Sequence, residues 1–255
     1  MTVIKKTHYV ETLNREVTLY IKLPEDYYHS EKSYPIIYLQ DGQNLFFDED
    51  AYNNQSWKLL DIVESNDALQ ETILVGISSP LSDKRLDEYS PVSFELKNYE
   101  PYGGMGDIYI DYIYFTLNPY ITKTYRTIPR QTIMLGSSMG GVISLYAAIK
   151  YPDTFNKVAS LSGAFFVAPT KLTTLFKEAH YKNDIKIYMD CGDNETFNAS
   201  KETYLKTNNK IYNTILTQAP KGAIIYKVIP GGEHSEYDWS NRLPSIVKYL
   251  LNTVE

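Results

Sequence analysis

The stretch from Gln131 to Pro152 constrains the fold of this chain more than any other part of the sequence. An apolar run at 133–135 leads into Gly-Ser-Ser-Met-Gly-Gly, and an almost wholly apolar segment follows at 142–149. This order predicts a buried strand, a sharp turn and a buried helix. The turn matches the pattern G-x-S-x-G, in which glycines allow a tight bend that lifts the central residue, Ser138, clear of the sheet.

The rest of the chain repeats this alternation of apolar runs and helical patterns. Strands are expected at 36–39, 72–77, 133–135, 157–161, 185–189 and 223–229, and helices at 57–63, 107–125, 142–149, 172–180, 201–217 and 239–251. Two earlier β-rich segments, 5–10 and 15–23, predict an antiparallel hairpin. The sequence therefore predicts an α/β fold with a mostly parallel eight-stranded sheet and helices on both faces. Because no linker divides the 255 residues, we expect a single domain, 1–255, without a large lid.

Two local features modify this prediction. Pro119 lies inside the helix expected at 107–125 and should kink or shorten it. The segment from Ser78 to Gly106 has no clear periodicity, and loops of this length are usually functional or peripheral. Within it, Arg85 and Glu88 are expected to form an ion pair that braces the loop.

Composition argues against several classes of function. The net charge is −6 and the Lys/Arg residues are not clustered, so nothing indicates nucleic-acid binding. The N-terminus lacks the apolar core of a signal peptide and no apolar run approaches a membrane span, which predicts a cytoplasmic protein without a membrane partner. Cys191 is the only cysteine and the four histidines are scattered, so we expect no disulfide, metal site or cofactor. The sequence does not indicate an oligomeric state.

Functional side chains are expected where the parallel strands end, because sites in open parallel sheets collect at the carboxyl edge. The relevant loops are 40–44, 137–141, 192–197 and 230–237. Ser138 in the second loop is the candidate nucleophile. His234 in the last loop is the candidate base, because an imidazole exchanges protons near neutral pH, whereas the other histidines do not follow predicted strands.

A serine–histidine pair also needs a carboxylate that orients the imidazole. In this fold the acid lies between serine and histidine in the sequence, after the penultimate strand. Glu195 is favoured because it has a full turn in which to reach back, Asp193 is the alternative, and Asp190 is a weaker third candidate.

The charge that develops on the substrate oxygen requires backbone N–H donors. The residue after the nucleophile, Met139, is expected to supply one donor. The second is expected from Gln43, in the turn Asp41-Gly42-Gln43 after an earlier strand. Without the serine, this turn would be interpreted only as an ordinary tight turn.

Taken together, several segments resemble the putative-esterase family of α/β-hydrolases. These are Leu39-Gln40-Asp41-Gly42-Gln43-Asn44-Leu45-Phe46, Arg85-Leu86-Asp87-Glu88-Tyr89-Ser90-Pro91, the turn at 136–141, and Gly231-Gly232-Glu233-His234 with Trp239. The family includes enterochelin esterases, feruloyl esterase domains, S-formylglutathione hydrolases and mycolyltransferases. The resemblance covers nearly the whole chain. It implies an α/β-hydrolase fold, a Ser138 nucleophile, a His234 base, an acid at Glu195 and an oxyanion hole formed by Gln43 and Met139.

These residues predict a serine carboxylesterase that acts on small, soluble esters through an acyl-enzyme. Acyl transfer to an alcohol, hydrolysis of a siderophore trilactone, and a catalytically silent binding protein are the alternatives. Trp57, Phe165 and Phe166 are candidate substrate contacts, although aromatic residues of this kind equally often pack in the core.

Overall fold

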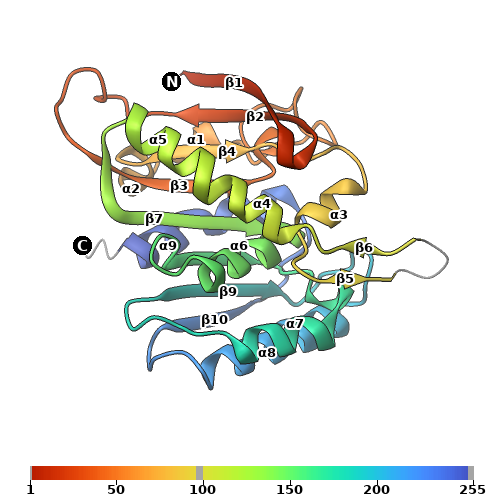
Figure 1. The fold of residues 1–255 in the computed structure, drawn as a ribbon. Coiled ribbons are helices and arrows are strands. Elements are labelled where there is room, and N and C mark those ends of the chain that lie inside the picture. Colours follow the sequence, from red (N-terminus) through yellow and green to blue (C-terminus); the bar gives the residue numbers. More distant parts are fainter. Residues whose placement is uncertain (1, 96–99, 252–255) are drawn as a thin grey trace.

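The computed structural model describes residues 2–95 and 100–251, and its centre is an eight-stranded sheet (Figure 1). The strand order is β1-β2-β4-β3-β7-β8-β9-β10. β2 pairs antiparallel with β1 and β4, and every other neighbouring pair is parallel. The predicted mostly parallel α/β sheet is therefore confirmed. The strands are β1 (Val3–Val10), β2 (Arg15–Lys22), β3 (Tyr34–Gln40), β4 (Ile73–Ile77), β7 (Thr127–Ser137), β8 (Lys157–Leu161), β9 (Lys186–Gly192) and β10 (Ile224–Ile229).

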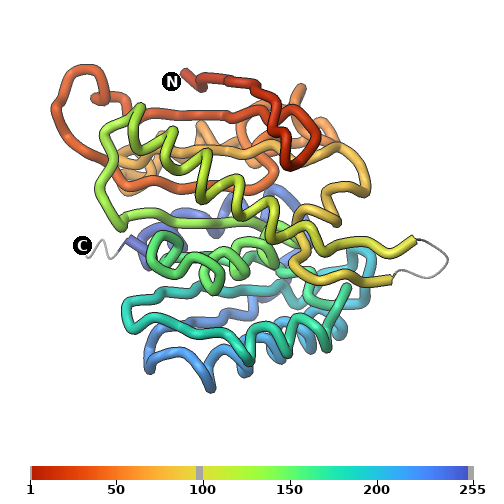
Figure 2. The backbone as a smooth tube through the Cα atoms, in the orientation of Figure 1, coloured from red at the N-terminus to blue at the C-terminus, as the bar shows by residue number. Residues whose placement is uncertain are grey.

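Helices cover both faces of the sheet, as the tube in Figure 2 also shows. One layer contains α1 (Leu59–Glu64), α2 (Asp67–Gln70) and α9 (Glu236–Leu251). The other contains α4 (Gly106–Tyr112), α5 (Asn118–Thr124), α6 (Met139–Lys150), α7 (Pro169–Glu178) and α8 (Lys201–Leu216). Alternate side chains of β3 enter the two cores, with Ile36 and Tyr38 on one side and Ile37 and Leu39 on the other. This explains the continuous apolar runs, because a strand covered on both faces has no polar side.

The helix expected at 107–125 is present and continues past Pro119. A π-helical turn, η3 (Ile113–Leu117), joins α4 to α5 directly before the proline. Proline has no N–H to donate to the preceding turn, and a π turn is one way to accommodate such a break in the α-helical pattern. The expected shortening does not occur.

The segment between β4 and α4 contains α3 (Lys84–Glu88) and a small hairpin of β5 (Ser93–Phe94) and β6 (Tyr102–Gly103). The predicted ion pair between Arg85 and Glu88 is wrong. Arg85 Nε lies 2.6 Å from Asp41 Oδ1, and Arg15 Nε lies 2.6 Å from Glu88 Oε1. Arg85 and Glu88 thus each reach a distant element, and these two ion pairs brace the segment against the main sheet.

Candidate active site

Ser138 lies in a sharp turn between β7 and α6, at the carboxyl edge of the sheet. Its backbone has φ 56° and ψ −123°, a conformation that L-residues rarely adopt and that costs energy. The turn is held by hydrogen bonds from Ser138 N–H to the Leu161 carbonyl (2.9 Å) and from Ala164 N–H to the Ser138 carbonyl (3.1 Å). It also requires glycine at 136, where a Cβ would lie 2.5 Å from the Gly140 carbonyl oxygen. These features are typical of a nucleophile elbow.

Glu195 and His234 form a buried pair in the loops after β9 and β10. His234 Nδ1 lies 2.6 Å from Glu195 Oε2, whereas Asp193 accepts a hydrogen bond from Gly231 N–H (2.7 Å) and does not contact the imidazole. Burial alone would raise the pKa of Glu195. Hydrogen bonds from His234, Ser162 and the Gly192 N–H outweigh that effect and lower it below its usual value. The carboxylate therefore stays ionised beside the ring.

Three aromatic side chains enclose the His234 imidazole, and the sequence did not indicate their role. Phe197 stacks on the ring with centroids 5.2 Å apart and planes 3° apart, while Trp239 meets it edge-on at 4.8 Å and Tyr204 lies at 5.1 Å. The side chain of His234 is only 6% exposed, whereas Phe197 is 56% exposed. Phe197 thus shields the imidazole from water. Its position in a loop at a strand end was the only available signal.

The loop after β3 contains a short 3-10 helix, η2 (Gly42–Asn44), beside the Ser138 turn. A Cβ at Gly140 would lie 3.4 Å from Asp41 Oδ2, so the two loops are in direct contact. The side chain of Gln43 is fixed by hydrogen bonds with Ser79, at 2.9 and 3.1 Å. Within residues 2–95 and 100–251, the backbone N–H groups of Gln43 and Met139 make no hydrogen bond.

An ion pair holds this loop in place. Arg85 donates to both carboxylate oxygens of Asp41, at 2.6 and 2.7 Å, and Ser79 Oγ donates to Asp41 Oδ1 at 2.7 Å. Asp41 itself adopts the left-handed conformation, with φ 55°. The bidentate contact fixes the orientation of the carboxylate as well as its charge, so Arg85 stabilises a strained turn at the edge of the site.

The aromatic residues predicted to contact substrate lie at different depths. Phe165, at the start of η4 (Phe165–Val167), is fully buried and packs against Phe176, and Trp57 is 4% exposed and packs against Trp239. Both have the packing role that the sequence left open. Phe166 is half-buried and packs against Tyr204 at 4.9 Å, next to the shell around His234.

Ser138 Oγ makes no hydrogen bond to the His234 ring in the described residues. Such contacts are often long before substrate binds and shorten in the reacting complex. The two residues are nevertheless linked through the end of β8, because Leu161 binds the Ser138 N–H and the next residue, Ser162, binds Glu195.

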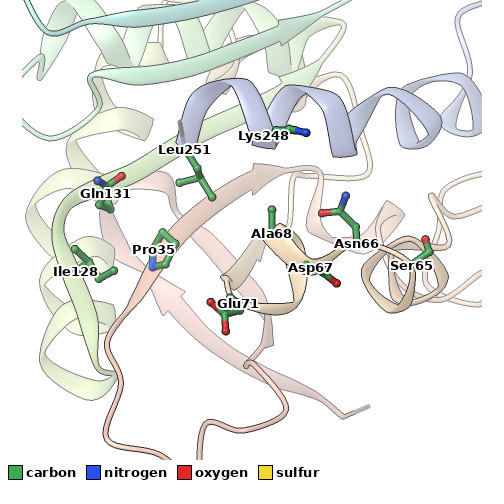
Figure 3. A pocket seen from close by; sticks show the side chains of 10 residues that line it. All are labelled: Pro35, Ser65, Asn66, Asp67, Ala68, Glu71, Ile128, Gln131, Lys248 and Leu251. Atoms are coloured by element: carbon green, nitrogen blue, oxygen red, sulfur yellow. The ribbon is translucent and has the colours of Figure 1, made fainter. Parts of the chain in front are cut away.

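A surface cavity of about 640 Å³ lies at the opposite edge of the sheet, near the starts of β3 and β7 (Figure 3). Its lining side chains come from these strands, from α2 and the residues on either side of it, and from the end of α9: Pro35, Ser65, Asn66, Asp67, Ala68, Glu71, Ile128, Gln131, Lys248 and Leu251. None of the predicted catalytic side chains lines it. This cavity is therefore separate from the candidate catalytic side chains at the carboxyl edge.

Within residues 2–95 and 100–251, none of the helices has the length and apolarity needed to cross a membrane. No cluster of three or more His, Cys, Asp or Glu side chains in those ranges is arranged to hold a metal ion.

Known proteins resemble this chain in sequence and in structure. The family model described as "Putative esterase" matches residues 10–250. The uncharacterized protein YbbA of Bacillus subtilis is 32% identical over 186 residues, which are 71% of this chain and 69% of YbbA. The uncharacterized protein YjcH of the same organism is 28% identical over 200 residues, 76% of this chain and 74% of YjcH.

Solved structures show the same fold. An IroE-like serine hydrolase from Shewanella oneidensis superposes with a TM-score of 0.79 and 21% identity, covering 100% of this chain and 82% of that one. The enterobactin esterase FES from Shigella flexneri superposes with a TM-score of 0.77 and 19% identity. This match covers 99% of this chain and 59% of FES. The match of the family model over nearly the whole chain is the deciding finding. The chain belongs to the "Putative esterase" family, a group of ester-hydrolysing enzymes with the α/β-hydrolase fold.

Proposed function

We propose that the protein is a serine carboxylesterase that forms an acyl-enzyme on Ser138. The observation that carries this proposal is the 2.6 Å contact between Glu195 and His234, at the sheet edge where Ser138 occupies a strained elbow. A carboxylate–imidazole pair and a serine held in a strand-end turn are the groups that nucleophilic acyl transfer needs.

In the acylation half, Ser138 Oγ attacks the ester carbonyl carbon and its proton passes to Nε2 of His234. Glu195 accepts a hydrogen bond from the Nδ1–H group of His234 and so stabilises the imidazolium. The oxyanion receives hydrogen bonds from the N–H groups of Gln43 and Met139, whose lack of other partners supports this role. When the tetrahedral intermediate collapses, the C–O bond to the alcohol breaks and the alcohol leaves with the proton from His234.

In the second half, a water molecule gives a proton to His234 and its oxygen attacks the acyl carbon. The bond to Ser138 Oγ then breaks, the serine recovers its proton and the carboxylic acid is released. Because Glu195 remains ionised next to the ring, His234 can alternate between accepting and donating a proton in both halves.

Substitution of the nucleophile tests the mechanism. Ser138→Ala should reduce hydrolysis of an activated short-chain ester by about 10⁴-fold or more and abolish labelling by a fluorophosphonate. Ser137→Ala, one residue earlier and also buried, is the matched control. It should keep both ester hydrolysis and fluorophosphonate labelling. Unchanged turnover by Ser138→Ala would refute the proposal.

A small, soluble ester is the proposed substrate class. Within it, a siderophore trilactone is the more specific candidate, because one protein of the same fold is described as an enterobactin esterase. Acyl transfer would use the same acyl-enzyme. A panel of acyl-chain lengths, aryl esters and a trilactone, with product analysis in the presence of added alcohols, separates these possibilities. A preference for simple esters would exclude the trilactone as the specific substrate. The absence of any new ester formed from the added alcohol would exclude acyl transfer.

A further inference from the structure

Ser162, which follows β8 directly, contacts the candidate triad acid on the side away from the imidazole. Its hydroxyl donates to Glu195 Oε1, while Glu195 Oε2 faces His234. The residue is fully buried and has φ 48°, an unusual conformation for serine. Its N–H lies 3.0 Å from the Asp190 carbonyl and 3.3 Å from Asp190 Oδ1. The backbone of Ser162 is therefore held in place by Asp190, near the end of β9.

The other neighbours of this hydroxyl determine where its proton points. Trp239 Nε1 donates to Ser162 Oγ at 3.0 Å and Arg242 Nη2 donates to it at 3.4 Å. Indole and guanidinium groups can only donate, so both contacts require the serine oxygen to act as acceptor. The hydroxyl has a single proton, and the remaining partner, Glu195, must accept it.

A buried ion pair, Arg242–Asp190, supports the hydrogen bonds around the Ser162 hydroxyl. Arg242 Nη1 lies 2.8 Å from Asp190 Oδ1, and Arg242 and Asp190 are 8% and 0% exposed. The pair fixes the guanidinium, which in turn supports the orientation of the serine hydroxyl. Charge-assisted hydrogen bonds of this kind are stronger than neutral ones, above all where water is excluded.

We propose that Ser162, oriented by Trp239 and Arg242, is a positioning residue that holds Glu195 in the ionised, fixed orientation that His234 requires. This inference rests on the proposed acyl-enzyme function of Ser138. It assigns Trp239 a second role besides packing on the imidazole: its N–H polarises the Ser162 hydroxyl toward the carboxylate. The lowered pKa of Glu195, to which the Ser162 contact contributes, supports it.

Removal of the hydroxyl is the direct test. A hydrogen bond to a charged group is worth roughly tenfold to a hundredfold in a rate constant, so Ser162→Gly should lower kcat by about that factor with little change in KM. Glycine is chosen because it adopts positive φ readily. Ser162→Ala serves as the second variant that lacks the hydroxyl, and both should keep fluorophosphonate labelling at a reduced rate.

A substitution of Trp239 separates its hydrogen bond to Ser162 from its packing on the imidazole. Trp239→Phe keeps an aromatic ring beside His234 but removes the N–H, and it should lower kcat by about threefold to tenfold. If Trp239 acts through Ser162, the effect of Trp239→Phe should vanish in the Ser162→Gly background.

The outcomes distinguish this inference from the proposed function. Loss of kcat in Ser162→Gly, with a non-additive double variant, supports the positioning role. A kcat within about twofold of the parent in folded Ser162→Gly and Ser162→Ala, or additive effects in the double variant, would overturn it while Ser138→Ala stays inactive. Activity that survives Ser138→Ala would instead remove the mechanism on which the inference depends.

Discussion

At the scale of single residues, two carboxylates of one loop have different partners. Only Glu195 contacts the His234 ring, whereas Asp193 binds the backbone of Gly231. We expect Glu195→Gln to lower kcat by about a hundredfold or more, because the amide cannot stabilise the imidazolium. Asp193→Asn should stay within about threefold of the parent. Steady-state kinetics on one activated ester measures both, and equal losses would contradict the assignment.

The same glutamate gives a prediction for stability against pH. Its pKa in the folded chain lies below 4.5, so its stabilising effect is fully present above that pH and is lost as pH falls through the lowered value. The difference in unfolding free energy between the parent and Glu195→Gln should therefore shrink as pH falls below 4.5. Urea unfolding at several pH values measures it. A difference that grows below pH 4.5 would argue against an ionised, stabilising carboxylate.

Phe197 combines an exposed position with a tight contact on the imidazole. Its 56% exposure compares with 6% for the His234 side chain beneath it. Phe197→Ala should increase the rate at which diethyl pyrocarbonate inactivates the enzyme by about threefold or more, because a shielded ring becomes accessible. Phe115→Ala, which removes another exposed phenylalanine, is the control. Identical inactivation rates for both variants would show that the stack does not shield the base.

At the scale of elements, α3 connects an irregular segment to the loop beside the Ser138 turn. Arg85 holds Asp41 at two oxygens, and Arg15 holds Glu88 in a similar way without contacting that loop. Arg85→Met should lower kcat by about tenfold or more, because the N–H groups of an oxyanion hole work only when they are preorganised. Arg15→Met should mainly reduce stability.

Thermal unfolding together with kinetics separates the two effects. An Arg15→Met variant with the same loss of kcat would mean that α3 as a whole, and not the contact with Asp41, supports the site.

At the scale of the whole molecule, the sequence predicted the sheet and its edge well. The strands are continuous apolar runs because both faces are covered, and such runs are visible without a structure. The positions of Ser138, Glu195 and His234 followed from strand ends in a fixed order. The partners of Arg85, Ser162 and Phe197 were not predictable in this way, because they depend on side chains that meet across distant loops and leave no local period in the sequence.

Cys191 allows a test of how the whole fold opens. It is the only cysteine, it lies fully buried in β9 between β8 and β10, and burial raises the pKa of its thiol. Both inaccessibility and the small fraction of thiolate suppress its reaction. We expect thiol reagents to leave the native enzyme active and unlabelled, and labelling in urea to rise with the same midpoint as the loss of tryptophan fluorescence.

Coincident midpoints would mean that the edge of the sheet carrying Glu195 unfolds together with the rest of the core, as in a two-state transition. Labelling at lower urea concentrations than the fluorescence change would show that β9 and β10 separate first. In that case activity should be lost with the labelling, because the Glu195–His234 pair spans the loops that follow these two strands.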